Sequence, residues 1–233
     1  FRSRCSIMFR LFGHEEPQLA SEILNTRVQT LLANHGEGAP IGFVDETNKQ
    51  LTPKSEAVQQ IDSLQQPMDN ILSGIPSWAL SPEPTKSSQR DQNDQNRASI
   101  RTATRAALSQ LATSLVNWKP TYLWLKFRQA ALMEPLRHIW KHDPSTLLQG
   151  IDTLIRYIGL PDEWNAHGPD GSMSGEIVGL KKKSGAALVA VSREVPQHLV
   201  PWLSQLSQAT KSLLASDGLI PLNQTHLYEF LSC

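Results

Sequence analysis

The sequence predicts an all-α protein, an α-solenoid of HEAT-like antiparallel helix pairs with disordered insertions. Three observations favour this class. Through residues 99–160, apolar side chains recur at spacings of three and four, which places them on one face of each of several successive helices. The expected connections between these helices are short, and no catalytic motif lies among them. Such closely spaced amphipathic helices are typical of stacked helical repeats.

The region 1–72 is expected to form a first helical repeat region. Its opening residues are typical of the end of a helix, with Gly13 as the expected stop, and a second helix is expected to begin near Pro17 and to end before Gly36. A weaker helix is expected over 53–72, where Pro67 should end or kink it. The next region, 73–98, is rich in Pro, Ser, Gln, Asn and Asp. We expect it to be a disordered insertion, because it offers few apolar groups to offset the entropy of ordering.

The region 99–160 should contain a HEAT-like helix pair and the first helix of the next repeat. The pair is expected at 99–118 and 121–141, with a kink at Pro135, which lacks a backbone donor and clashes with the preceding turn. Asp143 and Pro144 are typical of an N-cap and a first helical position. Gly159 is expected to end the third helix in the left-handed conformation.

The region 161–184 is rich in glycine and polar residues, so it is expected to be a loop with no regular element before Leu188. A further, truncated repeat is expected over 185–233, with a confident helix at 196–215 and a last helical turn at 225–231. Since the sequence opens on Phe1, we also expect it to be a fragment of a longer soluble protein.

Composition limits the possible functions. The chain has 233 residues, of which 39% are hydrophobic and 19% charged, so wholesale disorder is excluded. No run of about eighteen apolar residues occurs, so no membrane partner is expected. The two cysteines, Cys5 and Cys233, lie at opposite ends and indicate a reducing compartment. Lysine and arginine balance aspartate and glutamate overall, at 22 each, but residues 97–141 contain eight bases and a single acid, Glu134. An acidic partner is therefore expected.

No motif of an enzyme, cofactor or metal site stands out. The glycine-rich stretch lacks the order of a phosphate-binding loop, and a Met occupies the position of the nucleophile in GSMSG. His138 and His142 lie one helical turn apart, but no third ligand has useful spacing. Residues 181–183 are three lysines that are best explained as part of a solvated loop, and most tryptophans lie on apolar stripes, where core packing is the default. We therefore expect no catalysis, no cofactor and no metal.

Three runs of the sequence carry a resemblance. They are ALSQLATSLVNWKPTYLWLKFRQAALMEPLRHIW, LLQGIDTLIRYIGL and, after the polar loop, LVPWLSQLSQATKSLLASDGLIP. In helix order, loop placement and apolar identities, they resemble the central part of exportin-5-like nuclear export receptors, members of the importin-β or karyopherin family. The resemblance covers about residues 99–221.

The resemblance implies an armadillo-type HEAT-repeat fold and a non-catalytic receptor. Members of the family wrap around the GTP-bound form of the GTPase Ran together with cargo, contact nucleoporins, and shuttle between nucleus and cytoplasm. The cargo of exportin-5-like members is structured RNA or protein. Because the family binds Ran mainly through amino-terminal repeats, the resemblance assigns no Ran contact here and makes cargo binding the expected local role.

Five bases are candidate cargo-binding residues. If 99–118 is an outer helix and 121–141 its inner partner, the bases of the inner helix could face the cavity, and one base of the next helix would extend the row. The five are Lys126, Arg128, Arg137, Lys141 and Arg156. Such a row would attract phosphates or an acidic protein face in a salt-dependent way. The alternative, that these bases only keep the repeat soluble, stays open. So do two other functions, a HEAT scaffold without a transport role and an all-helical enzyme whose catalytic residues lie elsewhere.

Overall fold

A computed structural model describes residues 2–35, 56–81, 92–120, 122–160, 172–215 and 219–232. In these ranges all regular structure is helical and no strand occurs, so the predicted all-α class is confirmed. No helix of the described ranges combines the length and the apolar character that crossing a membrane requires.

The helices, in chain order, are α1 (Arg2–Glu15), α2 (Pro17–His35), α3 (Glu56–Gly74), α4 (Ser77–Leu80), α5 (Gln92–Asn117), α6 (Leu123–Met133), α7 (Arg137–Trp140), α8 (Leu147–Ile158), α9 (Ser172–Glu194), α10 (Pro196–Leu199), α11 (Leu203–Leu214) and α12 (Pro221–Ser232). Two short 3₁₀ helices, η2 (Pro144–Thr146) and η4 (Val200–Trp202), precede α8 and α11. The start of α2 at Pro17 agrees with the sequence prediction.

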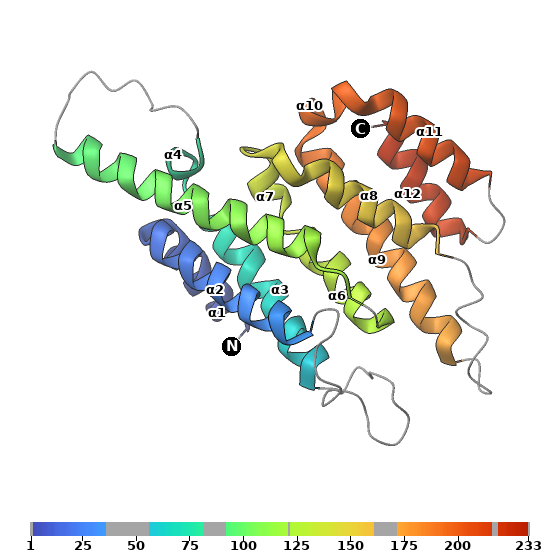
Figure 1. The fold of residues 1–233 in the computed structure, drawn as a ribbon, viewed down its shortest axis with the longest axis horizontal. Coiled ribbons are helices and arrows are strands. Elements are labelled where there is room, and N and C mark those ends of the chain that lie inside the picture. Colours follow the sequence, from blue (N-terminus) through green and yellow to red (C-terminus); the bar gives the residue numbers. More distant parts are fainter. Residues whose placement is uncertain are drawn as a thin grey trace.

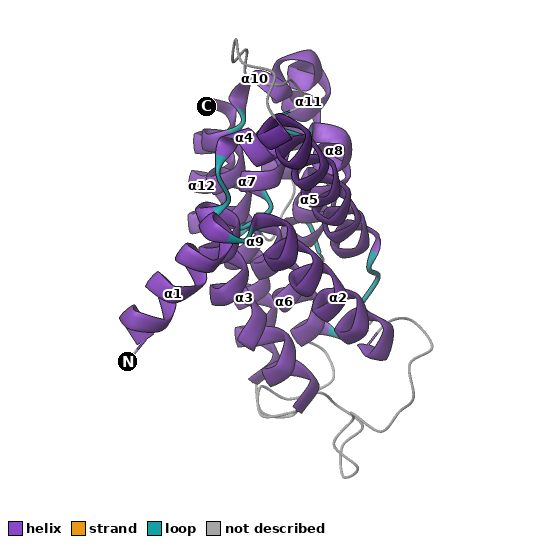
Figure 2. Cartoon of the chain, turned by 90° about the vertical axis from the view of Figure 1, so that its left-hand side faces the viewer, coloured by secondary structure: helices purple, strands orange, loops and turns teal. Residues whose placement is uncertain are grey.

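The long helices lie in two layers (Figure 2). In one layer α1 packs on α3, α3 on α6, α6 on α9 and α9 on α12. In the other layer α2 packs on α5, and α5 contacts α8. The layers are joined where α8 packs on α9 and where α11 contacts α12. The chain therefore advances from its N-terminal helices at one end of the stack to α11 and α12 at the other (Figure 1), around one continuous apolar core.

The helices expected to pair, at 99–118 and 121–141, do contact each other, but each packs more extensively on another helix. The first of these helices, α5, packs chiefly on α2, and the second, α6, packs chiefly on α9. The strongest contacts of α5 and α6 thus join each of them to a helix of its own layer.

Gly13 does not end a helix, as the sequence suggested, because α1 continues to Glu15. The glycine instead allows a close helix crossing. A Cβ atom at Gly13 would overlap the backbone carbonyl of Ile71 on α3, and a Cβ at Gly74 would overlap the carbonyl of Arg10 on α1. The two glycines let the backbones of α1 and α3 touch.

The insertion predicted over 73–98 is helical at both of its described ends. The helix α3 runs without interruption through Pro67 to Gly74, α4 follows at 77–80, and α5 begins at Gln92, seven residues before the expected start. The apolar groups in this stretch suffice to anchor it, because Ile75, Ala79 and Leu80 are buried in the core. Residues 82–91 lie outside the described ranges, so the prediction of disorder is untested there.

The effect of Pro135 is stronger than the predicted kink, because the expected helix over 121–141 is divided there. Helix α6 ends at Met133, a turn covers 134–136, and α7 begins at Arg137. The start of the next helical segment agrees with the prediction, because the Asp143 side chain accepts a hydrogen bond from the Ser145 amide at 3.2 Å.

Gly159 ends α8 in a right-handed conformation, with φ −84°, so the predicted left-handed cap is wrong. A close contact with another helix accounts for this glycine instead. A Cβ atom at this position would lie only 2.7 Å from Cδ2 of Leu213 on α11, so a larger residue would require the Leu213 side chain to shift.

The predicted loop over 161–184 is wrong from residue 172 onward, where α9 begins and continues for 23 residues. Its glycines weaken helix propensity, but tertiary contacts override that weakness. A Cβ on Gly179 would be 3.8 Å from the Phe127 ring, and one on Gly185 would overlap the His226 ring, so α9 packs closely between its neighbours. Residues 161–171 lie outside the described ranges.

The helix expected at 196–215 is divided into α10, η4 and α11, because Pro201 cannot donate a backbone hydrogen bond. The last helix, α12, starts at Pro221 and is longer than the turn expected at 225–231.

Candidate binding groove

Two of the five candidate cargo-binding bases, Arg128 and Arg137, reach across to α3 and form ion pairs there. Nη1 of Arg128 lies 2.7 Å from Oδ1 of Asp62, and Nη2 of Arg137 lies 2.9 Å from Oδ1 of Asp69. His138 Nε2 also faces Asp69, at 3.4 Å. The hydrogen bond from His138 and the charge of Arg137, opposed by burial, hold the pKa of Asp69 below its usual value.

A third candidate, Lys141, pairs with α9. Its Nζ lies 2.7 Å from Oε1 of Glu194, and this hydrogen bond lowers the pKa of Glu194. Further pairs continue in the same layer. Lys183 on α9 meets Glu134 after α6 at 2.7 Å, and Arg193 on α9 meets Glu229 on α12.

Cross-helix ion pairs therefore join α3 to α6, α6 to α9 and α9 to α12. They compensate the positive charge of this layer internally. The expected row of bases facing one cavity does not form, because Arg128, Arg137 and Lys141 are turned toward carboxylates of neighbouring helices. The local excess of bases in the sequence thus overestimates the positive charge offered to a partner.

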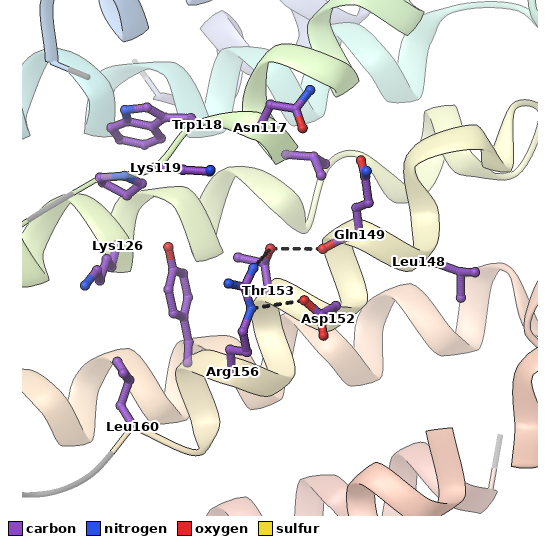
Figure 3. A pocket seen from close by; sticks show the side chains of 13 residues that line it. Asn117, Trp118, Lys119, Lys126, Leu148, Gln149, Asp152, Thr153, Arg156 and Leu160 are labelled. Atoms are coloured by element: carbon purple, nitrogen blue, oxygen red, sulfur yellow. Dashed lines mark hydrogen bonds and ion pairs between the residues drawn. The ribbon is translucent and has the colours of Figure 1, made fainter. Parts of the chain in front are cut away.

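The remaining two candidates, Lys126 and Arg156, line an open groove of about 690 Å³. The groove lies between the end of α5, α6 and α8 (Figure 3). Its lining is Val116, Asn117, Trp118, Lys119, Pro120, Lys126, Leu148, Gln149, Asp152, Thr153, Arg156, Tyr157 and Leu160.

The described residues of the groove lining include three bases and one acid. Lys119 and Arg156 approach it from opposite walls (Figure 3), and Lys126 stands on α6. Partial burial lowers the pKa of Lys126, because its ammonium group has lost part of its water shell. Nε of Arg156 lies 3.0 Å from Oδ2 of Asp152 one turn earlier on α8, but both side chains are about two-thirds exposed, at 67% and 66%. Such an exposed pair is weak and can exchange partners.

A buried amide fixes the walls of the groove. Gln129 on α6 is fully buried, and its Nε2 donates to the carbonyl oxygens of Leu115, at 2.8 Å, and Trp118, at 2.6 Å. These carbonyls belong to the end of α5, where helices leave acceptors unpaired. Tyr157 on α8 donates its hydroxyl hydrogen to Oε1 of the same amide. One side chain thus connects the three helices that form the groove.

The other sequence candidates have structural partners. Residues 181–183 are part of α9 and not of a solvated loop, since Lys181 is buried and Lys183 is paired with Glu134. His138 faces Asp69, whereas His142 lies against Arg105 and Ile139 in a separate small pocket. Within the described ranges, no group of three potential ligands is placed to hold a metal ion.

Sequence reasoning missed Lys119, Asp152 and Tyr157 as members of the site. Lys119 had a usable signal, because a base just after the expected end of one helix comes near the start of the next. The convergence of α5, α6 and α8 at one place had none, since it depends on how the layers pack.

Comparisons of the chain with models of protein families, with curated proteins and with solved structures find no match. The two-layer arrangement and the groove are therefore the features of the molecule that bear on its function.

Proposed function

We propose that the chain is a helical-repeat segment of a nuclear export receptor, similar to exportin-5-like members of the importin-β family, which binds RNA or protein cargo together with GTP-bound Ran. The observation that carries this proposal is the two-layer stack, in which α1, α3, α6, α9 and α12 pack on one another in chain order. Stacked helices of this kind are the basis of α-solenoids, whose extended surfaces enclose partners.

The charge distribution favours a local role in binding an anionic cargo surface. Arg128, Lys183 and Arg193 each lie in an ion pair with a neighbouring helix. The groove lining brings Lys119, Lys126 and Arg156 together with one acid, Asp152, among its described residues. A partner is therefore expected on the groove side, with an affinity that falls as salt rises.

The proposal is tested by recovery of the natural full-length protein on Ran loaded with GTP or with GDP, in the presence of nuclear extract. An export receptor should be recovered with the GTP form at least about tenfold better, which corresponds to about 1.4 kcal/mol of coupling. A known exportin serves as the positive control. Equal recovery with both nucleotide states would contradict the export function and leave a HEAT-type scaffold without a transport role.

A further inference from the structure

The groove between α5, α6 and α8 combines bases with apolar walls. Lys119, Lys126 and Arg156 surround a space that Pro120, Leu148 and Leu160 also line. Its volume, about 690 Å³, lies within the range of roughly 300 to 1,000 Å³ that is usual for sites binding small ligands or a few side chains. A groove of this size has room for a few side chains of a partner.

The pattern of charges argues against a nucleic-acid duplex as the occupant. Proteins that follow a phosphate backbone neutralise many phosphates with bases spread along the contact. Here the bases that would extend the row, Arg128, Arg137 and Lys141, are paired with carboxylates of neighbouring helices in the same layer. Three clustered bases suit one or two carboxylates at a defined place.

Asp152 shows how such a carboxylate can be held. Its Oδ2 lies 3.0 Å from Nε of Arg156, while Nη2 of Arg156 donates to Oγ1 of Thr153 at 3.1 Å. Figure 3 shows this pair at the edge of the groove. Because the pair is exposed, a carboxylate of a partner can replace Asp152 at the guanidinium group at little cost.

We infer that the groove binds a short peptide segment of a protein partner in which acidic side chains lie next to an apolar one. The carboxylates contact Lys126 and Arg156, with Lys119 at the opposite wall, and the apolar side chain packs on Leu160, beyond Arg156 at the end of α8. This inference deepens the proposed function. It rests on that function because it assumes that a partner binds on the groove side.

The test is a fluorescence-anisotropy titration of the complete protein with a labelled peptide in which Asp and Glu alternate with Leu and Phe. Replacement of both Lys126 and Arg156 by Gln should weaken binding by roughly tenfold, since two charge-assisted contacts are lost. Asp152→Asn should strengthen it by about two- to threefold, because the competing carboxylate is gone. The matched control replaces Arg27 and Lys211, exposed bases outside the groove lining, by Gln and should leave the affinity unchanged.

The same variants are titrated with a peptide carrying Asn and Gln in place of Asp and Glu, and with a double-stranded RNA hairpin. The inference would be supported if the neutral peptide bound weakly and if the groove variants left the RNA affinity unchanged. If the double variant bound the acidic peptide as tightly as the parent, the inference would be overturned. It would also be overturned if the groove variants lost RNA binding but kept peptide binding, because the occupant would then be a nucleic acid. Circular dichroism and thermal melting check that each variant is folded. Peptide binding without a preference for Ran-GTP would reject the export function and keep the peptide site.

Discussion

The hydroxyl group of Tyr157 on α8 donates a hydrogen bond to the side-chain oxygen of Gln129 on α6, which joins the two helical layers inside the core. The same amide donates to the carbonyls of Leu115 and Trp118 at the end of α5. Burial raises the pKa of Tyr157 far above its usual value, so the phenol keeps the proton that this bond needs. The walls of the groove are thus held by a small polar network in an apolar setting.

Replacement of Gln129 by Leu should destabilise the protein by about 2–4 kcal/mol, because it leaves two carbonyl oxygens and a hydroxyl group buried without partners. Tyr157→Phe should cost about 1 kcal/mol, since it removes only one hydrogen bond. Urea unfolding followed by circular dichroism measures both. Tyr228→Phe is the matched control, because Tyr228 is 63% exposed and its loss of a hydroxyl should have no effect. A Gln129→Leu variant as stable as the parent would contradict the role of the network.

Alanine at Gly13 or Gly74 should destabilise the protein, although alanine is the better helix former by about 1 kcal/mol. The reason is the overlap of the new Cβ with the backbone of the facing helix, which forces α1 and α3 apart. We expect a loss of about 1–3 kcal/mol in the free energy of unfolding for each change, measured by thermal or urea unfolding.

Gly179→Ala is the control for these glycine variants. A Cβ at Gly179 meets only an ordinary contact, at 3.8 Å from the Phe127 ring, so alanine should stabilise α9 by about 0.5–1 kcal/mol. Stabilisation by Gly13→Ala, as by Gly179→Ala, would contradict the close crossing of α1 and α3.

The stability of the protein should fall as the pH drops below about 6.5. Burial, together with the charges of Lys141, Arg105 and His198, lowers the pKa of His142 below the 6.5 that is usual for histidine. The unfolded chain therefore binds more protons than the folded one between the folded-state pKa and 6.5, and stability is gained as the pH rises through this window.

His142→Gln should flatten this pH dependence, as measured by the urea midpoint at a series of pH values from 5 to 8. It should not abolish it, because burial also lowers the pKa of His226. His14→Gln, at an exposed position on α1, is the control. An identical slope in the parent and in the His142→Gln variant would refute the assignment.

The ion pair of Arg128 and Asp62 should respond differently to loss of its two members. Arg128 is 15% exposed and Asp62 is 48% exposed. Asp62→Ala leaves a largely buried guanidinium without its carboxylate and should cost about 1–2 kcal/mol. Arg128→Met fills a similar volume without charge and should change stability by less than about 1 kcal/mol. Asp152→Ala, which breaks an exposed pair, should cost at most about 0.5 kcal/mol in the same urea experiment. A larger loss for Arg128→Met than for Asp62→Ala would contradict the asymmetry.

Several elements could be predicted because their causes are local. The start of α2 at Pro17, the break around Pro135 and the cap at Asp143 follow from the chemistry of proline and of a short carboxylate. The all-α class followed from apolar periodicity, which depends on residues within a few turns of one another. The existence of α9 could not be predicted in this way, because its glycines favour a loop until neighbouring helices pack on them.

In the candidate site, too, some features have local causes and others depend on how the helices pack. From the sequence alone it follows that the chain is helical, that Lys126 lies in a stretch with an excess of bases, and that Arg156 extends the expected row on the next helix. Which bases face a groove and which face a carboxylate depends on the tertiary structure, which pairs Arg128 with Asp62 and Arg137 with Asp69. The two kinds of feature differ in the range of the interactions that settle them. Helix formation and capping are settled between residues close in sequence, whereas the partner of a charge is settled by the packing of helices that lie far apart along the chain.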